Sequence, residues 1–554
     1  MITINTQNNS QLEKHWWLPL AVLACAQLSV SADNGAFSIA AANILSTLGG
    51  TLADIQLATT VYSLIAGSLM LVSGMLGIAF GWMSVFRMGL ILAMAGEFLC
   101  AFTPNMTILT WGARGLFGLG ASLVIPSVLG MVSVLYEGEQ RKKAFGVIAG
   151  SAALATILPI LLGAAIDMAG FRFTFAGMGI VFGLLLASSS VFHGERKPID
   201  IHSIDIPGSF VASIGLSLLL FGLSRISAWG ATVALPTAPF TIGGYSPALP
   251  LAFVGLVTLI ILLPLEKNRE KANYAAILPG SLIGNKTVRA GLVAIGLPFF
   301  YMGAQGILAT SYYQLALGLS ATNTAILGIL SGVPMLLGAT MIPMKFPKAD
   351  SRMVIRLGYL FLIAATGFMA IGMRQDYVSW YMLVATLLGG IGVGLVNSQA
   401  NNVVASAVSA QDSQKSGGIQ GAARNLGLAL GTAIAGSLLI ISMNNGVHEV
   451  VTSLDANLLA QSQRETLEQN VFTFEPTVVF EGRLDSVGDL NDEVRAELTH
   501  SFEQVRYNAA SKAMLFISGV CAVALLTTGP LRIKTAPTST PEADVAQSKQ
   551  GDEQ

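Results

Sequence analysis

Residues 106–147 read MTILTWGARGLFGLGASLVIPSVLGMVSVLYEGEQRKKAFGV, and this stretch decides the fold. Up to Tyr136 it is one apolar run of roughly thirty residues, long enough to cross a bilayer as a tilted helix. A charge in such a helix costs about 2.5 to 3.5 kcal/mol to insert, so Arg114 is expected to face protein or a water-filled cavity. The basic residues 141–143 follow at once and mark the cytoplasmic end of the helix by the positive-inside rule.

The composition of the whole chain agrees with a membrane protein. Of 554 residues, 53% are hydrophobic and only 11% are charged, whereas soluble domains carry about 25% charged residues. The formal net charge of -1 argues against nucleic acid as a partner. Cys25, Cys100 and Cys521 lie in apolar runs without metal-ligand spacing, so we expect them to pack as small hydrophobic residues. No metal, cofactor or enzyme active site is expected.

Apolar runs of about twenty residues predict an all-α membrane protein with about fourteen transmembrane helices. The predicted spans begin near Trp16, Ile55, Val85, Met106, Ala144, Phe171, Ile206, Ala248, Val288, Ala321, Met353, Val378, Ser416 and Ser511. Lys and Arg gather in the loops on one side, which predicts that both termini are cytoplasmic and that the chain lies in the cytoplasmic (inner) membrane. The short outer loops hold almost none, Arg172 and Arg374 being the exceptions.

A weak internal repeat divides the chain. The segment 87–93 in the third span is echoed by 356–362 in the eleventh, and 118–124 in the fourth is echoed by 390–396 in the twelfth, an offset of about 270 residues. This predicts an arrangement of six, two and six helices. We expect an N-terminal bundle at 1–200, two linker helices at 201–270, a C-terminal bundle at 271–534 and a disordered tail at 535–554.

One segment of the C-terminal half is not apolar. Residues 444–508 are polar and acidic, and by the order of spans they lie outside the membrane on the outer side. Val450–Gln469 and Asp492–Val505 are predicted to form two amphipathic helices, which would make a hairpin over the outer mouth. A solvated cap without a direct role is the simpler interpretation of this hairpin.

The ordered motifs resemble the fourteen-helix drug:proton antiporter branch of the major facilitator superfamily, of the quaternary-ammonium or multidrug type. The segment 113–121 followed by Pro126 resembles that superfamily's motif B, and 33–40 lies where the branch carries its Asp-led signature. Further matches are the segments 171–175, 205–208, 312–321 and 424–431. The resemblance implies a secondary transporter that binds small molecules and protons within the lipid bilayer, expected here to be a monomer.

Two motifs depart from the superfamily pattern. In motif A the glycines Gly74 and Gly81 are present, but Ile78 and Ala79 replace its charged pair, so the inner gate must close without that charge network. Motif C in the fifth span is thinned to Gly150, Pro159 and Gly163. These glycines and Pro159, together with Gly118 and Gly120 of motif B, are expected to serve gating and helix packing.

Three charged residues are candidates for proton coupling. Asp33 lies about 25 Å along the first span, close to the midplane, and is expected either to bind and release a proton or to form a permanent ion pair with Arg114. The resemblance implies a role in proton relay for Arg114, and a structural link to backbone carbonyls is the alternative. Glu97, toward the outer end of the third span, is expected at a mobile, water-reached position, with a second coupling role as the alternative.

Polar residues on three spans are candidates for a substrate cavity. Asn34 and Ser38 are one helical turn apart on the first span, Asn397 and Asn401 repeat this spacing on the twelfth, and Tyr301 and Gln305 do so on the ninth. Helix–helix hydrogen bonding is an equally good explanation of such pairs.

Three functions remain open from the sequence. The first is export of lipophilic, cationic, drug-like compounds in exchange for protons. The second is transport of an organic anion, siderophore or metabolite on the same scaffold. The third is a membrane sensor or partner subunit that does not transport, which the emptied motif A would allow.

Overall fold

The computed structural model describes an all-helical molecule. The described residues are 17–136, 140, 144, 147–148, 151, 154–155, 158–192, 205–230, 234–235, 238–272, 280, 284–345, 349–407, 413–454, 460–469, 472–488 and 490–531. Within them, thirteen helices are long and apolar enough to cross a membrane. The predicted all-α fold is therefore confirmed. The fifth predicted span, which begins at Ala144, is described in part: it is described without gaps from residue 158, and its residues 159–170 form the part of α8 (Pro159–Ser188) before a break at Gly170.

The N-terminal half is a bundle packed around two apolar cores. Its helices are α2 (Trp17–Ile39), α3 (Ala41–Leu48), α4 (Leu52–Phe80), α5 (Trp82–Ala101), η1 (Ile108–Ala113), α6 (Arg114–Leu135), α8 (Pro159–Ser188) and η2 (Ser189–Val191). Gly170 interrupts α8 with a φ of 80°, a conformation that favours glycine. The part of α8 after this break starts at Phe171, the predicted start of the sixth span.

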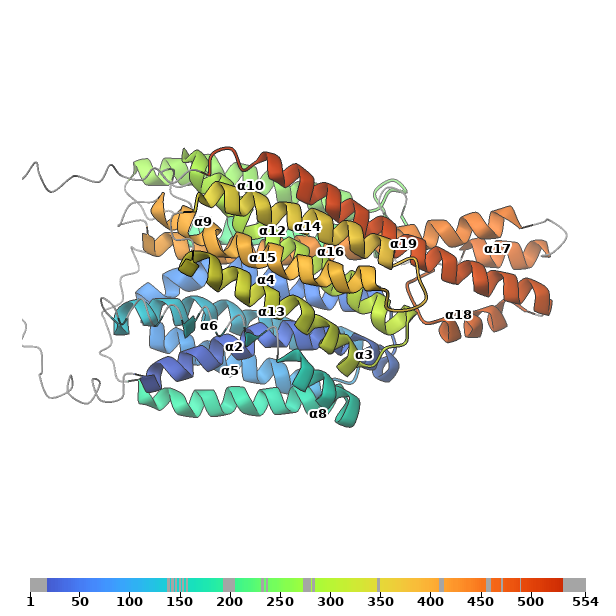
Figure 1. Ribbon diagram of the computed structural model, residues 1–554, viewed down its shortest axis with the longest axis horizontal. Coiled ribbons are helices and arrows are strands. Elements are labelled where there is room, and N and C mark those ends of the chain that lie inside the picture. Colours follow the sequence, from blue (N-terminus) through green and yellow to red (C-terminus); the bar gives the residue numbers. More distant parts are fainter. Residues whose placement is uncertain are drawn as a thin grey trace, which may run out of the picture.

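Two further helices and a second bundle follow in the chain (Figure 1). Helices α9 (Ile206–Trp229) and α10 (Ala248–Lys271) lie where the two linker helices are predicted, and a further apolar core is surrounded by α12 (Lys286–Ser311), η4 (Tyr312–Ala316), α13 (Ala321–Lys345), α14 (Ser351–Gly372), α15 (Trp380–Ser406), α16 (Ser413–Ser453) and α19 (Asp492–Leu526). Local sequence sets several starts. The side chains of Asp205, Asn285, Asp350 and Asn491 accept backbone N–H groups at the first turns of α9, α12, α14 and α19.

The internal repeat has a structural counterpart. Arg87 of α5 donates hydrogen bonds to the side chain and backbone of Ser189 at the end of α8, and Arg356 of α14 donates to Thr528 at the end of α19. The second echo matches too, because Gly118 packs on the Tyr62 carbonyl of α4 and Gly390 on the Ser331 carbonyl of α13. Equivalent helices in the two halves therefore use a corresponding arginine and a corresponding glycine for similar contacts.

The polar segment of the C-terminal half forms a folded outer subdomain that projects beyond the bundle (Figure 1). It comprises the end of α16, α17 (Gln461–Gln469), α18 (Thr477–Leu484), η5 (Asp485–Val487) and the start of α19. Its core contains Phe472, Phe474, Phe480, Leu484 and Phe502, each at most 1% exposed. Phe480 and Phe502 stack with ring centroids 4.0 Å apart.

The hairpin prediction was right in part. The helix predicted from Asp492 is present, but it continues without a break through the last span to Leu526. The single helix predicted over 450–469 is wrong, because α16 ends at Ser453 and α17 begins only at Gln461. The sequence prediction also missed α18, whose buried Phe480 and Leu484 fill the core of the subdomain.

Candidate functional site

The N-terminal bundle encloses an ion pair between α2 and α6. Arg114 donates through Nη1 to both carboxylate oxygens of Asp33, at 3.0 and 2.7 Å. Asp33 is 0% and Arg114 1% exposed, and the guanidinium lies 4.3 Å from the Phe37 ring and 4.7 Å from the Tyr62 ring. Of the two sequence alternatives for Asp33, this conformation has the ion pair rather than an acid open to water.

Glu97 of α5 joins the ion pair, contrary to the water-reached position expected for it. It is 1% exposed, and its carboxyl group lies near enough to Asp33 and Arg114 to interact electrostatically with both. The cluster therefore contains two carboxyl groups and one guanidinium, drawn from α2, α5 and α6. Among the described residues, Glu97 Oε1 and Arg114 Nε and Nη2 have no hydrogen-bond partner.

Local helix geometry brings these groups together. The turn before Arg114 is the π-helical segment η1, and such turns shift the register of the residues that follow them. Close helix packing does the rest: a Cβ on Gly96 would lie 2.7 Å from the Phe117 backbone nitrogen, and one on Gly120 would lie 2.5 Å from the Ala93 nitrogen. Small residues thus let α5 approach α6 closely enough for Glu97 to meet the ion pair.

The two bundles are joined by hydrogen bonds near their outer ends. Asp167 of α8 accepts the backbone N–H groups of Ala321 and Thr322 at the start of α13, at 3.1 and 2.8 Å. Gln314 of η4 donates to the Ile39 carbonyl at 2.8 Å, and Gln56 of α4 donates to the Ala433 carbonyl of α16 at 2.8 Å. This conformation is therefore closed at the end of the bundles that the sequence predicts to face outward.

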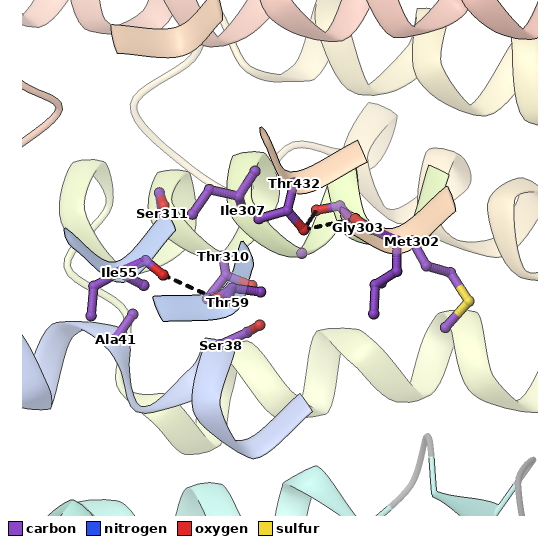
Figure 2. A pocket seen from close by; sticks show the side chains of 12 residues that line it. Ser38, Ala41, Ile55, Thr59, Met302, Gly303, Ile307, Thr310, Ser311 and Thr432 are labelled. Carbon is purple, nitrogen blue, oxygen red and sulfur yellow. Dashed lines mark hydrogen bonds between the residues drawn. The ribbon is translucent and has the colours of Figure 1, made fainter. Parts of the chain in front are cut away.

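A small cavity lies between the bundles below this closure, as Figure 2 shows. Its volume is about 30 Å³, enough for one or two water molecules. The lining residues are Ser38, Ala41, Ile55 and Thr59 from the N-terminal half and Met302, Gly303, Gly306, Ile307, Thr310, Ser311, Leu428 and Thr432 from the C-terminal half. Helices α2 and α4, which form its N-terminal wall, also carry Asp33 and Tyr62.

The residues expected to line a cavity are spread more widely. Ser38 lines the small cavity, whereas Tyr301 is 2% exposed and its phenol lies against Gly389 inside the C-terminal bundle. Gln305, Asn397 and Asn401 are partly exposed. Asn34 lies in α2, and its side chain is outside the described residues.

The glycines expected to serve gating and packing differ in their surroundings. A Cβ on Gly163 would lie 2.9 Å from the Ala321 carbonyl, so this glycine lets α8 approach α13 across the bundle interface. Pro159 packs on Gly35 within the N-terminal half, whereas a Cβ on Gly74 would meet nothing within 4 Å. Gly81 has a φ of 87° and separates α4 from α5.

Trp82 occupies the end of motif A, where the charged pair is missing. A Cβ on Gly77 or on Gly130 would lie 2.1 or 2.3 Å from its indole ring. The indole is therefore wedged between α4 and α6, and these two glycines are what allow it to fit.

Arg424, the first residue of the matched segment 424–431, is a further charged residue inside an apolar span. Arg424 of α16 donates through Nη2 to Asn401 Oδ1 of α15 at 2.8 Å, and its guanidinium lies 5.6 Å from the Phe299 ring of α12. No group of three or more His, Cys, Asp and Glu in the described part of the chain could hold a metal ion.

Comparison with known proteins decides the family. The family model of the Major Facilitator Superfamily matches residues 23–432. The chain belongs to the major facilitator superfamily. It is therefore a multi-pass membrane transporter and not an enzyme, as the sequence predicted.

Relatives of this chain include a probable transporter and a resistance protein. The chain is 26% identical to a probable actinorhodin transporter of Streptomyces coelicolor, over 81% of this chain and 78% of that protein. It is 24% identical to a puromycin resistance protein of Streptomyces alboniger, over 76% and 81%. The crystal structure of a peptide transporter in complex with sulfate is similar in fold, with a TM-score of 0.57 at 14% identity, covering 93% of this chain and 95% of that one.

Proposed function

We propose that this chain exports lipophilic, drug-like small molecules in exchange for protons by alternating access. The observation that carries the proposal is the buried cluster of Asp33, Glu97 and Arg114. Two carboxylates and one guanidinium would leave an uncompensated negative charge in the bundle, and such a charge costs several kcal/mol. The cluster avoids this charge when one carboxyl group holds a proton, so it can serve as a proton-binding site.

Release of the proton needs a second arrangement of the cluster. Arg114 has two nitrogens without hydrogen-bond partners among the described residues, and Glu97 has one such oxygen. The guanidinium can therefore turn from Asp33 toward Glu97 without breaking other bonds. We propose that opening of the outer side admits water from the adjoining cavity, and that the proton then exchanges.

Alternating access needs two halves that close at one end at a time. The hydrogen bonds made by Asp167, Gln314 and Gln56 hold the outer side closed. Because one chain supplies both halves, we propose that it works as a monomer, in the inner membrane with both termini cytoplasmic. The basic loop residues support this orientation.

A single proton supplies enough energy for export. Moving one charge through 100 mV provides about 2.3 kcal/mol. Since about 1.4 kcal/mol corresponds to a tenfold ratio, one proton supports a gradient of roughly fiftyfold for a neutral solute. The names of the relatives, a probable transporter and a resistance protein, support transport over a sensor role.

The transported compound could be a cation or an anion, and the charged residues bear on this choice. A cationic cargo, expected from the resemblance, would be drawn to a carboxylate on its path. Asp33 and Glu97 are buried in this conformation, and they would meet such a cargo only after the cluster opens. Arg424 is partly exposed and has no ion pair among the described residues, which favours the second candidate, transport of an organic anion.

Drug efflux in everted membrane vesicles tests the proposal. We expect uptake of puromycin, ethidium or fluorescein into vesicles that carry the protein, and loss of uptake when nigericin collapses the pH gradient. Vesicles with Asp33→Asn should lose the response to the gradient. Uptake that ignores the pH gradient, or the lack of uptake for the whole panel, would refute proton-coupled drug export.

A further inference from the structure

Arg114 and Arg424 both lie inside transmembrane helices, and their surroundings differ. Arg114 is 1% exposed and paired with the Asp33 carboxylate. Arg424 is partly exposed, and no ion pair joins it to a carboxylate among the residues that the structure describes. The fold uses the charge of Arg114 internally, whereas the charge of Arg424 remains available to a ligand.

Arg424 is held in place by neutral groups. Its Nη2 donates to Asn401 Oδ1, and Asn401 Nδ2 in turn donates to the Asn397 carbonyl at 3.3 Å. The Nε atom has no hydrogen-bond partner among the described residues. One side of the guanidinium is therefore fixed by the protein, and donors remain for a further acceptor.

The site lies toward the inner end of the bundle and faces the N-terminal half. Arg424 is eleven residues from the start of α16, about 16 Å along the helix, and Asn401 is five residues from the end of α15. Gly421, one turn before Arg424, faces Met70 of α4. Arg424, Asn401 and Phe299 are all partly exposed, and they come from α16, α15 and α12.

We propose that Arg424, Asn401 and Phe299 bind the acidic group of an aromatic organic anion, and that this Arg424 site selects the cargo. A guanidinium with unused donors matches a planar carboxylate, which accepts two parallel N–H groups. The Phe299 ring offers an apolar face beside the charge for the aromatic part of the ligand. The inference rests on the proposed export function, because the site selects cargo only in a protein that carries cargo.

Binding to the purified protein tests the site without transport. The probes are 2-naphthoate and 2-naphthamide, which match in shape and differ in charge, and the binding of each is measured directly by isothermal titration calorimetry. We expect naphthoate to bind at least tenfold more tightly than naphthamide. Arg424→Gln should abolish this preference while leaving the affinity for naphthamide unchanged, which shows that the variant is folded.

Two further variants separate charge from structure. Asn401→Asp keeps the arginine and places a carboxylate beside it, so it should also remove the preference for naphthoate. Arg356→Gln removes an inner-side cation that bonds to Thr528, and it should leave the preference intact.

An equal affinity for both probes, no binding of naphthoate, or a preference that survives Arg424→Gln would overturn the proposal. Failure of proton-coupled drug export would show separately, as the absence of gradient-driven uptake in vesicles.

Discussion

Removing the Asp167 carboxylate should open the outer side of the transporter. This carboxylate accepts the backbone N–H groups of Ala321 and Thr322 and the Thr322 hydroxyl, all from the opposite bundle. Because Asp167 is exposed to solvent, each bond contributes at the low end of the usual range, about 0.5 kcal/mol. Loss of the three bonds in Asp167→Ala therefore costs the closed state about 1.5 kcal/mol, a shift of roughly tenfold toward the open state.

Cysteine labelling from the outside measures this shift. A single cysteine at Thr59, in the cavity below the closure, is introduced after Cys25, Cys100 and Cys521 are replaced. We expect a membrane-impermeant maleimide to label it about tenfold faster in Asp167→Ala. Asp376→Ala removes another exposed acid of the outer side and should not change the rate. An unchanged labelling rate in Asp167→Ala, or an equal rise in Asp376→Ala, would refute the proposed role of Asp167 in holding the outer side closed.

Three further predictions concern packing and pH. Gly130→Ala should lower the free energy of unfolding in detergent by about 1 to 3 kcal/mol, because the added methyl group would lie against Trp82. Gly74→Ala should leave this free energy unchanged, because a methyl group there would contact no other atom. Phe480→Ala should lower the free energy of unfolding of the outer subdomain by about 3 to 5 kcal/mol and make the subdomain sensitive to limited proteolysis. Val478→Ala, at an exposed position, should do neither. Burial raises the pKa of the Glu475 carboxyl above its ordinary value, although Arg483 and Thr473 oppose this. The carboxyl group therefore favours the folded subdomain most below about pH 4.5, and this contribution is lost as the pH rises through the folded pKa. Hydrogen exchange over residues 472–488 should show that loss in the wild type and a flatter pH profile in Glu475→Gln.

The helices could be predicted because each is long and apolar. Helix starts at Ile206, Ala248 and Ala321 agree with the prediction to the residue. The predicted start of the last span, Ser511, is too late, because the polar first turns of α19 are predicted as a separate amphipathic helix. Residues 492–510 contain no proline or glycine to end a helix, and the two segments are one helix.

The site could be predicted only in part. Asp33 and Arg114 stand out because charge is rare in apolar spans, and their pairing was one of two alternatives. The position of Glu97 could not be found from the sequence, since it depends on how closely α5 packs on α6 at Gly96 and Gly120. The role of Trp82 was hidden for the same reason, because the glycines that accept its indole ring lie on two different helices.

Substrate-driven proton movement is the most direct test of the central claim, that the buried acids of the N-terminal bundle exchange a proton with each transport cycle. Proteoliposomes loaded with a pH-sensitive dye and given the exported probe should show a proton flux with the wild-type protein. The flux should disappear in Asp33→Asn and in Glu97→Gln, and both variants should still bind the probe. An undiminished flux in both variants would contradict the account.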